Sequence, residues 1–539
     1  MTPRVTLARL LDANFAAGPA ASAHLRLVTS DGVSVEAGEH GALRVEAATL
    51  RRLAFEAFRD INFLYRTSHL EGWAGILDDP AVSNNDRFVA AALLENAAIA
   101  AEGVLPACQD TGTATVIGLK GEGVTVGAGA ADEKAIANGV HDAYAQCNLR
   151  FFQVAPVSLF EDRPTGTNLP AQIDLHAVGH DEPGGREYRL LFVAKSSGSA
   201  NKTTFSQENR TLLEDEAFEA FLRRQVTSLG VAGCPPYHLA VVVGGTSAER
   251  NLKTLKLATA GALDHLPDIS GAAGRDVHAD PGARFRDHAW EARLLAIARE
   301  TGLGAQFGGV SLALDARVLR LPRHAASLPV SVGVSCSAHR NAFARIDRAG
   351  AWLEDFDQDP ARFMPRALAA LERSRVSAPR IDLAVTVRKV CAQLSGRPVG
   401  TPVLLSGPMV VARDAAHARF ARMLREGGSL PAYLRDHVVY YAGPAQTPPG
   451  HVIGSFGPTT AQRMDPYVRS FMAAGASLVM LAKGNRTREA AAACGDFGGF
   501  SLGTIGGAAA LIAKENVTRD EAIDNHGRSL YDCMGEYAE

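Results

Sequence analysis

Apolar residues recur at helical spacing through the early part of the chain. Between about residues 46 and 102, one set includes Phe55, Phe58 and Ile61, and a later set includes Val89 and Leu93. Residues three to four positions apart lie on one face of a helix, so this pattern predicts amphipathic helices. Helices are therefore expected to precede Cys108, the first of the cysteines considered below.

Short continuous apolar runs follow, most of them beside a glycine, at 115–119, 189–195 and 238–245. They alternate with helical patterns at 214–229 and 289–301. Continuous runs of this length are typical of strands buried on both faces, and their alternation with helices indicates an α/β architecture. We assign residues 1–355 to one α/β domain.

The pattern changes in the last third of the chain. Residues 356–373 are acidic and then helical, and we interpret them as a linker. Beyond them, in residues 374–539, short apolar runs are punctuated by glycine and proline, at 403–408, 438–444, 452–458 and 478–484. Such runs with few long helical patterns predict a β-rich second domain.

Composition narrows the class of protein. A chain of 539 residues exceeds the size of a single core, and a net charge of −3 argues against a nucleic-acid-binding or polybasic membrane surface. Asp12 and Asn14 interrupt the only candidate for a signal segment, and the longest uncharged stretches, 225–248 and 437–462, are broken by proline and glycine. We expect a cytoplasmic protein with a small-molecule partner, no nucleic acid and no membrane.

Three cysteines lie in turns rich in glycine, proline or polar residues: Cys108 in Leu-Pro-Ala-Cys-Gln-Asp-Thr-Gly, Cys234 in Ala-Gly-Cys-Pro-Pro, and Cys336 in Val-Ser-Cys-Ser-Ala-His. Three thiolates leave one coordination position free, where an iron or zinc ion can bind substrate as a Lewis acid. The competing interpretation is that all are packing residues, as we interpret Cys147, Cys391, Cys494 and Cys533.

Cations in turns supply a second signal. Arg150, Arg413, Arg463 and Lys483 each lie near an apolar run, and such a set suits a dicarboxylate because guanidinium groups bind carboxylates bidentately. Asp110, two residues from Cys108, is a candidate proton carrier or orienting group. His324, twelve residues before Cys336, is a candidate for proton transfer near neutral pH.

Seven strings in series resemble class I fumarate hydratase, the iron–sulfur hydro-lyase, over essentially the whole chain. They are Cys-Gln-Asp-Thr-Gly at 108–112, Lys-Ser-Ser-Gly-Ser-Ala-Asn-Lys from Lys195, Gly-Cys-Pro-Pro from Gly233, Pro-Arg-His from Pro322 with Cys336 beyond it, Ala-Arg-Asp-Ala-Ala-His from Ala412, Gly-Pro-Thr-Thr-Ala-Gln-Arg-Met from Gly457, and Ala-Lys-Gly-Asn from Ala482.

The resemblance implies a [4Fe-4S] cluster held by Cys108, Cys234 and Cys336, with one iron free of protein thiolate. It also implies a homodimer whose α/β N-terminal domain carries the cluster and whose swivelling, β-barrel-like C-terminal domain closes over it. The substrate contacts it implies are Gln109, Arg150, Gly198, Arg413, Thr459, Arg463 and Lys483.

The expected reaction is reversible hydration of fumarate to S-malate, a step of the tricarboxylic acid cycle. We expect Thr459 to act as the base and Asp110 with His324 as the acid pair, although the reverse assignment stays open. A hydro-lyase acting on tartrate or mesaconate is the nearest alternative. A mononuclear zinc enzyme with three cysteine ligands also remains possible on spacing alone. A non-catalytic iron or redox sensor could use the same cysteines, but it would not need the four cationic residues named above.

Overall fold

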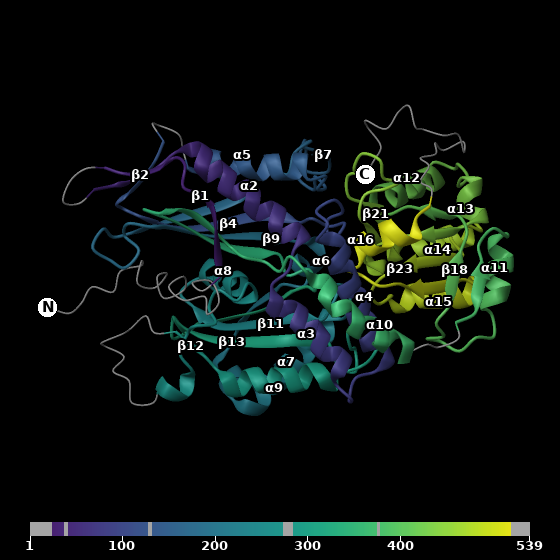
Figure 1. Ribbon diagram of the computed structural model, residues 1–539. Coiled ribbons are helices and arrows are strands. Elements are labelled where there is room, and N and C mark those ends of the chain that lie inside the picture. The colour runs from purple at the N-terminus through teal and green to yellow at the C-terminus, as the bar shows by residue number, and fades with distance from the viewer. Residues whose placement is uncertain (1–23, 37–40, 128–131, 273–283, 374–377, 519–539) are drawn as a thin grey trace.

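The computed structural model describes residues 24–36, 41–127, 132–272, 284–373 and 378–518. The described residues form two regions, with the N-terminal region on the left of Figure 1 and the C-terminal region, coloured green to yellow, on the right. Cys533 lies outside the described residues.

Two mixed sheets build the N-terminal region. The six-stranded sheet has the order β1-β16-β15-β9-β4-β8, and the five-stranded sheet has the order β10-β14-β11-β13-β12. The strands of the first are β1 (Leu25–Thr29), β16 (Gly350–Glu354), β15 (Asn341–Asp347), β9 (Tyr188–Lys195), β4 (Thr113–Gly121) and β8 (Gln172–Val178). Those of the second are β10 (Thr204–Glu208), β14 (Leu328–Ser335), β11 (Tyr237–Gly245), β13 (Ala313–Arg323) and β12 (Phe285–Arg286).

Helices cover the outer faces of both sheets (Figure 1). Helices α2 (Ala47–Phe63) and α5 (Asp132–Gln146) share an apolar core with the six-stranded sheet, and α7 (Asp215–Leu229) and α9 (His288–Glu300) share one with the five-stranded sheet. Between the sheets, α8 (Ala248–Thr259) packs with residues of both. The strands are thus buried on two faces, as their continuous apolar runs predict.

The segment interpreted as a linker is mostly helical. It contains a short 3₁₀ turn (Pro360–Phe363) and α10 (Met364–Arg373), which packs on α3 (Thr67–Asp78) and α4 (Asn84–Ala100). Buried Ala367 and Ala370 of α10 belong to the same apolar core as α4. This helix is therefore an integral part of the N-terminal region's packing rather than a free connection.

The C-terminal region is mixed α/β, so the prediction of a β-rich domain with few helices is wrong. Its described residues form a four-stranded parallel sheet, β19-β20-β23-β24, and two two-stranded sheets, β17-β18 and β21-β22. Among the described residues, the strand pairings do not close these sheets into a barrel. The strands are β17 (Arg380–Asp382), β18 (Leu404–Ser406), β19 (Met409–Val411), β20 (Val438–Tyr440), β21 (Ala442–Pro444), β22 (Phe456–Pro458), β23 (Val479–Ala482) and β24 (Phe500–Gly503).

Five helices of 5 to 12 residues pack around these strands, and the sequence pattern missed them because most are shorter than the window over which helical periodicity is distinguishable. They are α11 (Val387–Leu394), α12 (Asp414–Arg425), α13 (Ala432–Asp436), α14 (Asp465–Ala473) and α15 (Arg488–Phe497). Their apolar residues and those of the parallel sheet form one core.

The end of the described chain returns to the N-terminal region. Helix α16 (Ala509–Leu511) lies against α4, where the buried Asn96 Oδ1 accepts hydrogen bonds from the backbone N–H groups of Ala510 at 2.9 Å and Leu511 at 3.1 Å. Apolar residues of α3, α4, β22 and α16 share one core. Among the described residues, none of the helices combines the length and apolar character that crossing a membrane requires.

Candidate active site

Strand pairing brings the three turns that carry Cys108, Cys234 and Cys336 to one end of the N-terminal region. Thr113, just after the Cys108 turn, pairs with Lys195 at the end of β9, and His238, just after Cys234, pairs with Ser335 beside Cys336. The three thiols form one buried group with Ala338 and line a single cavity. Residues spread over more than two hundred positions therefore meet at the junction with the C-terminal region.

Glycines make room around this cavity. Cys234 has the left-handed φ of 60°. A Cβ atom at Gly506 would lie 2.5 Å from Cys234 Sγ and 2.7 Å from Cδ of Lys483, too close for any side chain to fit without displacing them. Segments of both regions thus approach the thiols closely.

Buried cations offset the desolvation of the thiols. Burial raises the pKa of Cys108 to about 11 and also raises the pKa of Cys234. Burial acts in the same direction on Cys336, but Arg340 and the hydroxyl of Ser196 outweigh it and lower the pKa of that thiol. Arg340 is buried, and none of its three guanidinium nitrogens has a hydrogen-bond partner in the described structure.

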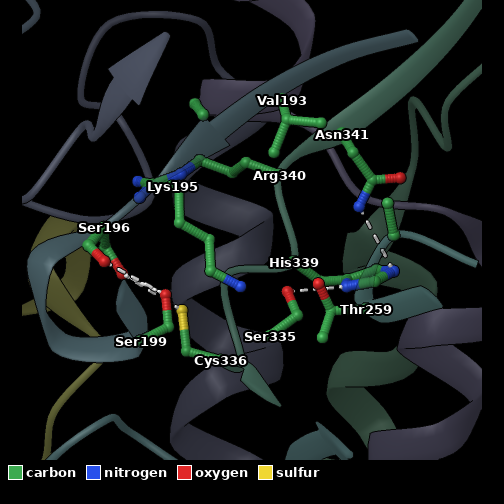
Figure 2. A pocket seen from close by; sticks show the side chains of 12 residues that line it. Val193, Lys195, Ser196, Ser199, Thr259, Ser335, Cys336, His339, Arg340 and Asn341 are labelled. Carbon is green, nitrogen blue, oxygen red and sulfur yellow. Dashed lines mark hydrogen bonds between the residues drawn. The ribbon is translucent and has the colours of Figure 1, made fainter. Parts of the chain in front are cut away.

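Figure 2 shows a second small cavity behind Cys336, on the side of the six-stranded sheet. Ser196 Oγ lies 3.6 Å from Cys336 Sγ and 3.1 Å from Ser199 Oγ, and Lys195 Nζ donates to the carbonyl of Val334 at 2.5 Å. Burial lowers the pKa of Lys195 to about 8. Hydroxyl and ammonium groups therefore surround the Cys336 turn from this side as well.

Asp110 is held as a hydrogen-bond acceptor at the edge of the thiol cavity. Its Oδ2 accepts from the Ser197 backbone N–H at 2.9 Å and the Ser197 hydroxyl at 2.7 Å, and Oδ1 accepts from the Gly112 N–H at 3.2 Å. Gly198, in the short helix α6 (Ser197–Ala200), lines the same cavity. The carboxylate is thus fixed beside the thiols with its charge partly balanced by donors.

The C-terminal region supplies Thr459 and Lys483 to the junction. Thr459 Oγ1 accepts a hydrogen bond from Arg463 Nη1 at 3.1 Å, and the Lys483 backbone N–H donates to the carbonyl of Thr459 at 3.1 Å. Lys483 Nζ donates to Cys234 Sγ at 2.6 Å. Arg463 also forms an ion pair with Asp414, the first residue of α12.

Arg150 and Arg413 approach each other from different regions. A Cβ atom at Gly443 would lie 2.8 Å from Arg150 Nη1 and 3.1 Å from the guanidinium carbon of Arg413, so both groups crowd the same glycine. Arg150 Nη1 donates to the carbonyl of Pro444 at 3.1 Å. Gln109 bridges the regions too, because its Nε2 donates to the carbonyl of Pro458 at 3.1 Å.

Comparison with known proteins identifies this arrangement. A family model described as fumarate hydratase matches residues 51–345, and one described as the fumarase C-terminus matches residues 350–528. The chain is 47% identical over 499 residues to the aerobic class I fumarate hydratase of Escherichia coli K12, covering 92% of this chain and 88% of that protein. It is 47% identical to fumarate hydratase 2 of Leishmania major, covering 90% of this chain and 82% of that protein.

The chain belongs to the class I fumarate hydratase family. Two weaker relatives come from Methanocaldococcus jannaschii, and their names provisionally assign them as the alpha and beta subunits of an L(+)-tartrate dehydratase. The alpha subunit is 28% identical over 47% of this chain, and the beta subunit is 31% identical over 25% of it.

The donor set of the cavity fits the iron–sulfur cluster expected of a class I fumarate hydratase. An unpartnered, buried guanidinium is costly unless an anionic group lies beside it, and Arg340 has Cys108, Cys336 and Asp110 as its charged neighbours. In the described part of the chain, no three His, Cys, Asp or Glu side chains converge where one metal ion could be held. The three thiols line one cavity, and this placement suits a cluster in which each cysteine binds a different iron.

His324 does not join the other predicted residues within one chain. It lies in the exposed turn between β13 and β14, where its Nδ1 accepts from the Ala326 N–H at 3.2 Å. Cys336 follows the opposite end of the eight-residue strand β14, and such a strand spans about 26 Å. The twelve-residue spacing suggested proximity, but an extended strand separates the two residues.

Sequence reasoning missed Arg340. Its only signal is a position four residues after Cys336 in the same turn, which does not distinguish it from a surface arginine. Its burial becomes evident only from β15, which starts at the next residue and pairs with β9 inside the six-stranded sheet. Arg340 precedes this central strand and is only 4% exposed.

Proposed function

We propose that this chain catalyses the reversible hydration of fumarate to S-malate at the junction of its two regions. The observation that carries the proposal is a buried cavity lined by Cys108, Cys234 and Cys336 and faced by Lys483 of the C-terminal region. Family membership supports the reaction, and the three thiols would hold a [4Fe-4S] cluster. The cations around the cavity favour an enzyme over a redox sensor.

Cations from both regions are available to bind a dicarboxylate. Arg150 and Arg413 both crowd Gly443, while Arg463 and Lys483 both follow Thr459 in the chain and hydrogen-bond to it, Arg463 at the hydroxyl and Lys483 at the carbonyl. An arginine fork matches a carboxylate bidentately, and a dianionic substrate needs at least two such positions. We propose that these four residues, with Gln109 and the backbone at Gly198, orient the substrate.

We assign proton transfer at carbon to Thr459. In dehydration of malate its oxygen would take the proton from the carbon next to the departing hydroxyl, and in hydration it would return that proton. A threonine hydroxyl is a weak base, but the hydrogen bond from Arg463 Nη1 favours its deprotonated form. The same cations stabilise the negative charge that develops on the substrate carboxylate.

We assign proton transfer at oxygen to Asp110. In hydration it would accept a proton from water, and in dehydration it would deliver that proton to the leaving hydroxide. The bound cluster would supply a Lewis-acidic iron at the substrate hydroxyl. Ser197 orients the carboxylate through two hydrogen bonds. A part for His324 requires a second copy of the chain in the proposed homodimer.

The C-terminal region would move as a body to admit substrate, as the swivelling domain of the family resemblance implies. Gln109 to Pro458 and Lys483 to Cys234 are two of the polar contacts between the regions that opening would break. We place this activity in the cytoplasm as part of the same proposal.

Substrate preference distinguishes fumarate hydration from the alternatives. The anaerobically prepared protein is supplied with fumarate, mesaconate or S-malate at equal concentration, and with tartrate for dehydration, and products are followed by chiral chromatography. We expect S-malate from fumarate as the fastest reaction. Tartrate dehydration that exceeds malate dehydration would instead favour the tartrate alternative, toward which the weaker relatives point.

A further inference from the structure

Two buried histidines, His69 and His238, and the half-buried His339 lie behind the cysteine turns. Their rings stack: the centroids of His238 and His339 are 3.8 Å apart, and those of His69 and His238 are 5.0 Å apart. His69 comes from α3, His238 from β11, and His339 follows the Cys336 turn, where Figure 2 shows its ring beside Ser335.

Two of these rings belong to a chain of three hydrogen bonds. Asp315 of β13 contacts His238 Nδ1 at 2.8 Å, His238 Nε2 contacts His69 Nδ1 at 3.0 Å, and His69 Nε2 contacts the carbonyl of Ser337 at 2.7 Å. Both ends of this chain, a carboxylate and a carbonyl, are acceptors. Three hydrogen bonds between them therefore need three protons on ring nitrogens.

Two neutral imidazoles carry only two such protons. The chain is complete only if one ring holds an extra proton, so one of the two histidines is an imidazolium. Asp315 does not supply the missing proton, because the guanidinium of Arg317, whose Nη1 donates to Asp315 Oδ1 at 2.7 Å, favours the ionised carboxylate. Arg317 in turn binds Asp264.

The extra proton belongs to His238, because its Nδ1 faces the Asp315 carboxylate at 2.8 Å while neither ring nitrogen of His69 faces a negative charge. Burial and the neighbouring charge of His238 lower the pKa of His69 to about 3, so His69 is the neutral partner. Burial alone would raise the pKa of Asp315, but His238 and Arg317 outweigh it and hold Asp315 as a carboxylate. The other ionisable groups facing the pair are His339, Arg66 and Tyr65; burial raises the pKa of Tyr65, so none of the three offers a negative charge.

The far end of the chain of hydrogen bonds reaches the cysteine turns. Ser337 follows Cys336, and its backbone N–H donates to the carbonyl of Cys234 at 2.9 Å. His69 thus binds the one residue that ties these two turns together. By holding the carbonyl of Ser337, His69 helps to set the distance between the turns that carry Cys234 and Cys336.

We propose that His69 and His238 are positioning residues for the cysteine turns. His238 carries the extra proton that the three hydrogen bonds require, and it holds His69 in the tautomer that donates from Nε2 to Ser337 O. This inference rests on the proposed function only in that the turns are taken to hold the cluster. Groups that orient metal ligands typically change metal affinity 10- to 100-fold when they are removed.

The test compares His69→Leu with His69→Gln, because glutamine can keep a donor near the position of Nε2. Each variant is loaded anaerobically, and the rate of iron release to a chelator is followed beside that of the wild type. We expect roughly tenfold faster release for His69→Leu and release near the wild-type rate for His69→Gln. His176→Gln, a change in a half-buried histidine on β8, serves as the matched control.

Histidine-specific ¹⁵N NMR of the full chain reads the protonation state directly. We expect one imidazole doubly protonated at pH 8, with its signal lost in Asp315→Asn. If His69→Leu does not fold, Asp315→Asn takes its place as the variant that disrupts the chain of hydrogen bonds. Finding every imidazole neutral at pH 8, or equal iron release from wild type and both loaded His69 variants, would overturn the inference. Wild-type protein that takes up no iron or sulfide would overturn the proposed function instead.

Discussion

Lys483 comes from the C-terminal region, yet its ammonium donates to Cys234 of the N-terminal region at 2.6 Å. Burial alone would lower the pKa of Lys483, but the nearby thiols raise it overall, so the ammonium stays charged. Arg340 has no comparable partner among the described residues. Two buried cations thus face the thiols. Lys483 has a hydrogen-bond partner there, and Arg340 has none among the described residues.

Thr459→Ala should lower kcat by roughly 10²-fold or more and change KM little, because the hydroxyl acts in proton transfer rather than in binding. Thr459→Ser keeps the hydroxyl bonded to Arg463 and should retain most of the turnover. Steady-state kinetics on samples of equal iron content checks both variants. Near-normal turnover by loaded Thr459→Ala would remove Thr459 from the role of base.

Arg340→Met should stabilise the cluster-free chain and weaken cluster binding, because it removes a buried cation that only the loaded cavity satisfies. The expected gain in free energy of unfolding without cluster is on the order of 1–3 kcal/mol. Denaturant unfolding of cluster-free and loaded protein measures both effects, with Arg340→Lys as a control that keeps the charge. A cluster-free chain destabilised by Arg340→Met would show that the guanidinium is satisfied in some other way.

At the scale of elements, the continuous apolar runs predicted β4, β9 and β11, and helical spacing predicted α7 and α9 within a residue or two of each end. Cys234 and Cys336 meet because β11 and β14 pair antiparallel in a register that sets His238 opposite Ser335. That register is not readable from spacing, so the sequence does not show that strand β14 separates His324 from Cys336. The C-terminal helices were missed because they are only 5 to 12 residues long and give little helical periodicity.

His417 gives α12 a sensitivity to acid. Burial lowers its pKa to about 4 from 6.5, so the folded state keeps the ring neutral while the unfolded chain protonates it. Its stabilising contribution is therefore complete above pH 6.5 and is lost as the pH falls towards 4, by up to about 3 kcal/mol. Urea unfolding at pH 7 and pH 5 should show a smaller loss for His417→Gln than for the wild type. An equal loss in both would contradict the assignment.

At the scale of the whole molecule, the site exists only where the two regions meet. The cysteines, Asp110 and Arg340 come from the N-terminal region, and Thr459, Arg463 and Lys483 come from the C-terminal region. Asn96 ties the two together, since it binds the backbone of α16 and its Nδ2 donates to the carbonyl of Ala107, beside Cys108.

The most direct test of this account measures iron, sulfide and S-malate formation from fumarate in the same anaerobic samples, loaded to different extents. We predict a rate proportional to the content of [4Fe-4S] cluster and close to zero without it, with Cys336→Ala inactive at any loading. Fumarate hydration at an undiminished rate by protein free of iron and sulfide would contradict the account.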